Sequence, residues 1–144
     1  YGPAGFRKIS KSGKHDGEGK GNIVYFGGTT SMTEGDIYHF KSDVTWELAN
    51  CNAAATSDGL LVVALGAASD INGVLLRGTV TLHTIDGSES VGDVLYLSED
   101  NTGHANMAPP GGNGDIVRVI GYCLDASNGQ IWFDPDKTFV EVTA

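Results

Sequence analysis

Short apolar or alternating stretches, separated by turn-forming residues, recur along the whole chain. Gly, Asp, Asn, Ser and Pro interrupt them at short intervals. This spacing predicts strands at 22–26, 36–40, 45–48, 60–65, 73–82, 93–98, 116–123, 130–133 and 138–142. Only residues 48–56 have helical character, and their turn-forming residues limit it to a turn or two. We therefore expect an all-β fold, an antiparallel sandwich or barrel-like domain of short strands with Gly-rich turns.

Two of these stretches, 60–65 and 73–82, begin as unbroken apolar runs. A strand with one solvated face should alternate, so these strands are predicted to be buried on both faces, in the core or against another subunit. The polar link 67–73 would join them as a hairpin, and Gly78 indicates a bulge or a close backbone approach. The candidates for an oligomer interface are Leu60, Leu61, Val63, Val74, Leu75, Leu76 and Val80.

A Gly-Asp pair stands directly before a predicted strand at 35–36, 92–93 and 114–115. Gly supplies the backbone conformation of a tight turn, and Asp can bond the turn backbone. The three pairs are either remnants of an internal repeat or a common way to open a strand.

Charge divides the chain into two parts. Residues 1–20 carry five basic and two acidic residues, a net charge of +3, whereas the remainder carries four basic and sixteen acidic residues, −12. An acidic body repels phosphate backbones, so we expect no binding to nucleic acid. We expect a basic arm or linker at 1–20 and one β domain at 21–144. Arg7, Lys8 and Lys11 are candidates for docking on a neighbouring subunit; the alternative is a flexible, solvated terminus.

Two cysteines, Cys51 and Cys123, are too few for a disulfide framework and lie in apolar contexts. They are predicted to be buried free thiols, which suits assembly in a reducing cytoplasm. The longest purely apolar run spans only residues 60–65, far short of a membrane helix, so no membrane insertion is expected.

No catalytic arrangement stands out in the sequence. There is no GxSxG motif, and the Gly-rich stretch 111–115 lacks the Lys-Ser/Thr of a phosphate-binding loop. The four histidines have no metal-ligand spacing among themselves or with the cysteines. We therefore expect a protein that is not an enzyme and that needs no cofactor.

Two weaker kinds of site remain as hypotheses. Asp134 and Asp136 flank Pro135 in an oxygen-rich loop that could hold a calcium ion, although solvated acidic turns are more common. Trp46 and Trp132 could stack on a host glycan, but packing in the core or in a subunit interface is the more frequent role of such residues.

The order and spacing of several motifs resemble virion proteins of bacteriophages, chiefly tail fibres and related appendages of marine and cyanobacterial phages. The resemblance covers nearly the whole chain. Its motifs are GFRKIS (5–10), NIVYFG (22–27), GDIYHF (35–40), WELA (46–49), DGLLVVALG (58–66), GVLLRGTVTL (73–82), VGDVLYLS (91–98), DIVRVIGYCL (115–124) and QIWFDPDKTFVEV (130–142). The chain departs from this pattern at Cys51, where a smaller or acidic residue is expected, and at Asp134, where Asn is more usual.

The resemblance implies a virion structural protein, assembled in the host cytoplasm and carried on the phage particle. Its leading form is a trimeric tail-fibre or appendage domain for trimerisation or host attachment, in contact with other virion proteins. The initial Tyr1 in place of Met is consistent with a processed product or a piece of a longer protein. The alternative is a capsid decoration (cement) protein that stabilises the head, and a third reading is a host-glycan-binding domain.

Overall fold

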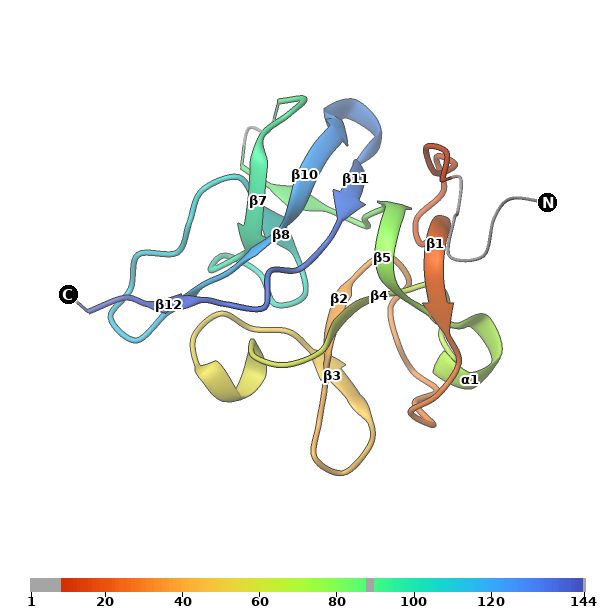
Figure 1. Cartoon of the computed structure of the whole chain (residues 1–144), viewed down its shortest axis with the longest axis horizontal. Coiled ribbons are helices and arrows are strands. Elements are labelled where there is room, and N and C mark those ends of the chain that lie inside the picture. The colour runs from red at the N-terminus through yellow and green to blue at the C-terminus, as the bar shows by residue number, and fades with distance from the viewer. Residues whose placement is uncertain (1–8, 88–89, 144) are drawn as a thin grey trace.

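Strands dominate the computed structural model, which describes residues 9–87 and 90–143 (Figure 1). The strands are β1 (Gly19–Val24), β2 (Ile37–Phe40), β3 (Trp46–Leu48), β4 (Leu61–Ala64), β5 (Val74–Thr81), β6 (Ile85–Asp86), β7 (Val94–Leu97), β8 (Ala105–Asn106), β9 (Ile116–Val117), β10 (Val119–Asp125), β11 (Gln130–Phe133) and β12 (Val140–Glu141). Within the described ranges, the helical elements are the single turns η1 (Ala54–Thr56), α1 (Ser69–Asn72) and η2 (Ala126–Asn128). The all-β prediction is confirmed.

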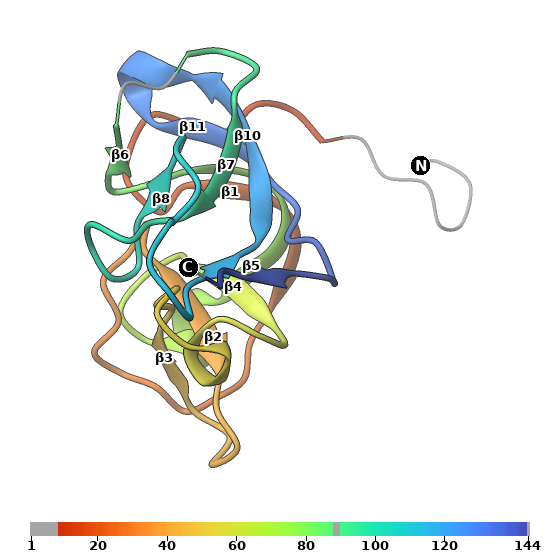
Figure 2. The same cartoon turned by 90° about the vertical axis from the view of Figure 1, so that its left-hand side faces the viewer.

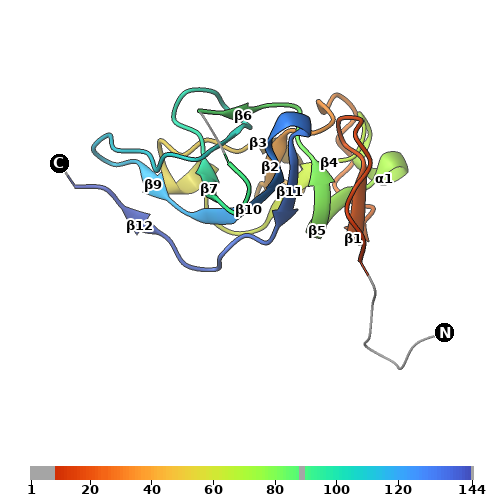
Figure 3. The same cartoon turned by 90° about the horizontal axis from the view of Figure 1, so that it is seen from above.

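Most strands belong to one curled sheet. Its order is β3-β2-β4-β5-β11-β10-β7-β8-β6, with β1 paired to β5 off this path, and β12 and β9 form a separate two-stranded sheet. Strands β2 and β3 lie at one end of the molecule and β7, β10 and β11 at the other (Figure 2). Strand β12 lies far from β1 along the long axis (Figure 3). All paired strands are antiparallel except β6 and β8.

Strand β5 pairs with three other strands, and they are divided between its two edges. Strand β1 follows one edge over its whole length, whereas β4 and β11 share the other. The register between β1 and β5 shifts by one residue, so that Leu76 and Arg77 lie opposite Asn22 and Leu75 pairs with Ile23. At Gly78 a Cβ atom would come within 2.1 Å of the Lys20 carbonyl oxygen. Both the predicted bulge and the predicted close approach are therefore present.

The apolar run of β4 is explained by two layers of core within the same chain. Leu61 and Val63 belong to the main core cluster, and Val62 and Ala64 belong to a second cluster on the other face of the strand. The second cluster also contains Trp46 and is extended by partly buried side chains such as Leu76.

This packing corrects most of the interface candidates. Leu61, Val63, Val74, Leu75 and Val80 are at most 2% exposed in the single chain, so they have no surface to offer a second copy. Leu60, which is 41% exposed, and the partly buried Leu76 remain at the surface. The hairpin of β4 and β5 is present, with α1 in its polar link.

The described part of the predicted arm, residues 9–20, packs on the domain. The Thr79 hydroxyl donates to the Ser10 carbonyl at 2.6 Å, and the buried Gln130 amide donates to the Ser12 carbonyl at 2.5 Å. Lys11 pairs with Asp125 at 3.5 Å. The boundary placed after residue 20 is also wrong, because it falls inside β1. Arg7 and Lys8 lie outside the described residues.

The three Gly-Asp pairs adopt the same turn. Gly35, Gly92 and Gly114 have φ of 86°, 90° and 86°, and in each turn the following Asp N–H donates to the carbonyl three residues earlier. These left-handed values are why glycine is required at each position. Strands β2, β7 and β9 then begin one residue after the Asp.

Both cysteines are buried free thiols, as predicted. Burial raises the pKa of Cys51 to about 11, and the carboxylates of Asp115 and Glu99 add to the effect. A thiol with so high a pKa is almost entirely protonated at neutral pH and therefore weakly nucleophilic.

Candidate functional site

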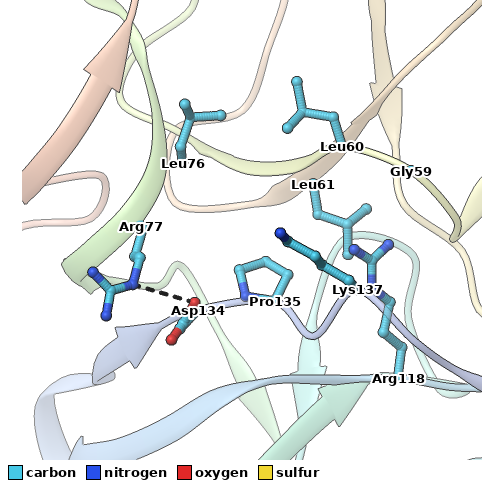
Figure 4. A pocket seen from close by; sticks show the side chains of 9 residues that line it. All are labelled: Gly59, Leu60, Leu61, Leu76, Arg77, Arg118, Asp134, Pro135 and Lys137. Atoms are coloured by element: carbon cyan, nitrogen blue, oxygen red, sulfur yellow. Dashed lines mark ion pairs between the residues drawn. The ribbon is translucent and has the colours of Figure 1, made fainter.

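An open pocket of about 360 Å³ lies between the β4–β5 hairpin and the segment that follows β11 (Figure 4). The bulge in β5 explains part of its lining, because it brings the consecutive residues Leu76 and Arg77 to the same site. The lining residues are Gly59, Leu60, Leu61, Leu76, Arg77, Arg118, Asp134, Pro135 and Lys137.

Basic residues are concentrated at this pocket. Residues 21–144 contain only four, and Arg77, Arg118 and Lys137 line the pocket, whereas Lys41 does not. They come from three separate parts of the fold: β5, the junction of β9 and β10, and the segment between β11 and β12. In a body with an excess of acidic residues, this gathering creates a local site for negative charge.

Arg118 is the buried cation of the pocket, with 5% of its surface exposed. Its Nε donates to the Asp136 carbonyl at 2.6 Å, and its Nη1 donates to the Ser57 carbonyl at 2.8 Å. Within the described residues it forms no ion pair, although the carboxylates of Asp58 and Asp136 act on it from a distance. Burial lowers the pKa of Arg118, yet an arginine stays charged at neutral pH. The two backbone bonds fix the plane of the guanidinium group.

Arg77 is held at the rim by two contacts. Its Nε forms an ion pair with Asp134 Oδ1 at 3.3 Å, drawn as a dashed line in Figure 4, and its guanidinium carbon lies 5.1 Å from the ring centre of Trp132. Its charge is therefore partly neutralised. Lys137 is exposed and takes part in no ion pair with the described part of the chain. The pocket consequently keeps a net positive charge next to an aliphatic wall formed by Leu60, Leu76 and Pro135.

A second hollow of about 320 Å³ adjoins the first across the segment 134–137. Tyr122 and Val119 line it together with that segment. Tyr122 is 45% exposed, and its cross-strand neighbour in the sheet is the partly buried Trp132. The two rings therefore belong to one aromatic surface beside the basic pocket.

The candidate cation and glycan residues have other contacts. Asp134 pairs with Arg77, and Asp136 accepts from the Thr138 N–H at 3.3 Å. Over residues 9–87 and 90–143, no three His, Cys, Asp or Glu side chains are arranged to hold a metal ion. Trp46 is 4% exposed and its Nε1 donates to the Phe26 carbonyl, so it is a core residue with no face left for a sugar. Trp132 remains at the surface.

A polar cluster that the sequence did not indicate forms around Asp36. His83 and His104 have ring centres 6.2 Å apart, and each donates from Nδ1 to a carboxylate: His83 to Asp16 at 3.0 Å and His104 to Asp86 at 3.2 Å. These residues come from four separate segments, around residues 16, 36, 83–86 and 104, so no local spacing could have revealed the cluster.

Asp36 differs from its counterparts in the other two Gly-Asp turns. Asp93 and Asp115 each accept the first N–H of their own turn, at 2.7 and 2.9 Å. In the Asp36 turn that N–H donates to the Tyr38 hydroxyl instead, and the buried Asp36 Oδ1 has no hydrogen-bond partner among the described residues. Burial raises the pKa of Asp36, while the two nearby histidines act in the opposite direction.

The helices of the described ranges are all too short and too polar to cross a membrane. No protein-family model matches the chain, and no match was found among curated proteins or among solved structures.

Proposed function

We propose that this chain is a non-enzymatic structural domain of a bacteriophage particle, a tail-fibre or appendage domain that assembles as a homotrimer. The order and spacing of its motifs resemble such domains over nearly the whole chain. A domain of a phage particle must stay folded outside a cell. An all-β fold of short strands joined by tight glycine turns is consistent with that requirement.

The observation that carries the assembly part of the proposal is the exposed apolar surface at β12. Val140 is 66% exposed and the preceding Phe139 is 38% exposed. In the described chain β12 pairs only with β9, which leaves its other edge open. Open apolar edges promote pairing with another chain, so natural proteins cover them or blunt them with charge. Here a neighbouring subunit would supply the cover.

The decisive experiment is the solution mass, measured by light scattering at two protein concentrations. A stable species with three times the mass of the chain supports the proposal. A monomer at high concentration contradicts it and favours a decoration protein that assembles only on its capsid.

A host-glycan-binding role is a second candidate, favoured by the aromatic surface of Tyr122 and Trp132. Sugar rings stack on exposed aromatic faces, and acidic side chains such as Asp136 lie beside this surface. A glycan array tests it. Binding that is lost in Tyr122→Ala would support this role, whereas an array without hits would remove it.

A further inference from the structure

The pocket has the chemistry of a site for an acid carried on an apolar body. Arg118 and Lys137 supply positive charge that no carboxylate of the described chain neutralises through an ion pair. Leu60, which is 41% exposed, and Pro135 supply aliphatic surface next to them. Charge-assisted hydrogen bonds from arginine favour a planar carboxylate, and the aliphatic wall favours an apolar neighbour on the same ligand.

The chain itself exposes a segment of matching chemistry. Phe139 and Val140 are exposed apolar residues, and the next residue, Glu141, is exposed and forms no ion pair with the described residues. This segment lies at the open edge of β12. It therefore combines a carboxylate with an adjacent apolar surface in need of cover.

We propose that the pocket binds residues 139–141 of a second copy of this chain. The Glu141 carboxylate of that copy faces Arg118 and Lys137, and its Phe139, two residues away and therefore on the same face as Glu141, packs on Leu60 and the rest of the aliphatic wall. This inference rests on the proposed function, since it names the contact through which copies assemble.

Two other classes of ligand fit the pocket less well. Sugars favour aromatic platforms, and the pocket wall itself is aliphatic. A polyphosphate or nucleic acid would meet the −12 charge of residues 21–144 at long range. A single carboxylate on a short peptide segment avoids most of that repulsion.

The first test titrates a capped Phe-Val-Glu-Val peptide, the sequence of residues 139–142, into the full chain and follows binding by calorimetry. The chain carries Glu141→Lys, so that neighbouring copies do not compete for the pocket. We expect saturable binding, and about tenfold weaker binding of the matched Phe-Val-Gln-Val peptide. Equal binding of the two peptides, or no binding, would overturn the inference.

Two substitutions in that same Glu141→Lys chain locate the site. Lys137→Gln should weaken binding of the acidic peptide about tenfold, because it removes an exposed pocket charge without touching the core. Lys41 is the one basic residue of 21–144 that does not line the pocket, so Lys41→Gln should leave the affinity for the peptide unchanged. An equal effect of both substitutions would mean general electrostatic attraction and would overturn the site. Tighter binding of sialic acid or inorganic phosphate than of the peptide would overturn the ligand class.

A charge exchange tests the contact between whole chains. Lys137→Glu and Glu141→Lys should each abolish self-association measured by light scattering, whereas an equal mixture of the two variants should form pairs, because one partner then offers a basic pocket and the other an acidic segment. A closed ring of three is not expected from the mixture, since it would always place two copies of the same variant in contact. An oligomer that persists in both single variants would overturn this inference and leave the proposed function intact. A wild-type monomer would instead count against the proposed function, while the peptide titration would still judge the pocket.

Discussion

Asp36 occupies the same turn position as Asp93 and Asp115, yet its carboxylate has a different environment. It is 7% exposed, and no described residue donates a hydrogen bond to one of its two oxygens. The groups that act on its charge are His104 and His83, which favour ionisation, and Asp16, which opposes it. The net result is a raised pKa, dominated by burial. The ionised form of this residue is therefore held by the fold at a cost in stability.

We expect Asp36→Asn to raise the melting temperature at pH 7. The folded-state pKa of Asp36 lies above the unfolded value of about 3.9, so its contribution to stability is greatest below that pH and is lost as pH rises through the folded-state pKa. The gain should therefore vanish near pH 3. Thermal unfolding at both pH values measures it.

The control is Asp93→Asn, the same change in the equivalent turn. An Asn oxygen can still accept the Ser90 N–H, so stability should stay within about 0.5 kcal/mol of the wild type. A loss of stability in Asp36→Asn at pH 7 would contradict the prediction and indicate that the two histidines stabilise the charged form.

Gly78 is required by the close contact of two backbones. Its φ is 143°, and a Cβ atom would lie 2.1 Å from the Lys20 carbonyl oxygen. We expect Gly78→Ala to destabilise the fold by about 3 kcal/mol or more, since β1 must move away from β5. Chemical denaturation measures the change, and Gly111→Ala, where a Cβ meets open space, should have little effect. Similar stabilities of the two variants would refute the importance of this contact.

At the scale of the element, the apolar run of strand β4 could be buried within one chain or against a second subunit. Val62 and Val63 point to opposite faces, and each is fully buried within the same chain. We expect Val62→Ala and Val63→Ala each to lower the free energy of unfolding by about 1.5–3 kcal/mol. The loss should be the same at low and high protein concentration.

The matched control for β4 is Ile71→Ala, an apolar residue that is 79% exposed on α1. Its effect should be small. A loss in Val63→Ala that grows with protein concentration would mean that this side chain contacts another subunit after all.

The elements themselves were largely predictable, and their partners were not. The strands were found because alternation and glycine turns are local signals, as at the three Gly-Asp turns. The two short strands β6 and β8 were missed, since two residues carry no periodicity. Whether Leu61 lies in the core or in an interface could not be predicted, because it depends on which segments cover its strand. The basic pocket and the Asp36 cluster were missed because distant segments form them. Contacts between segments that are far apart in the sequence cannot be predicted from the spacing of residues along the chain.

At the scale of the whole molecule, the two ends of the described chain differ, because one is bonded to the main sheet and the other has an open strand edge. The described start of the chain, residues 10–13, is bonded to β5 and β11. At the other end, β12 leaves an exposed apolar edge beside a pocket that carries positive charge. The molecule thus presents both an apolar and acidic segment and a basic, aliphatic pocket on its surface. Two different complementary patches on one chain allow a head-to-tail contact between identical subunits, which closes into a ring when the rotation between neighbours permits it.

We expect Val140→Lys to lower the mass of the assembled chain to that of a monomer without changing its far-ultraviolet circular dichroism. A lysine on an open edge strand opposes pairing with another chain, and Val140 is 66% exposed, so the core does not depend on it. The control is Ile71→Lys, which places the same charge on another exposed apolar position, on α1, and should leave the mass unchanged. If both variants associate like the wild type, the subunits meet through a surface other than β12. If both dissociate, added charge alone weakens assembly, and the edge has no special role.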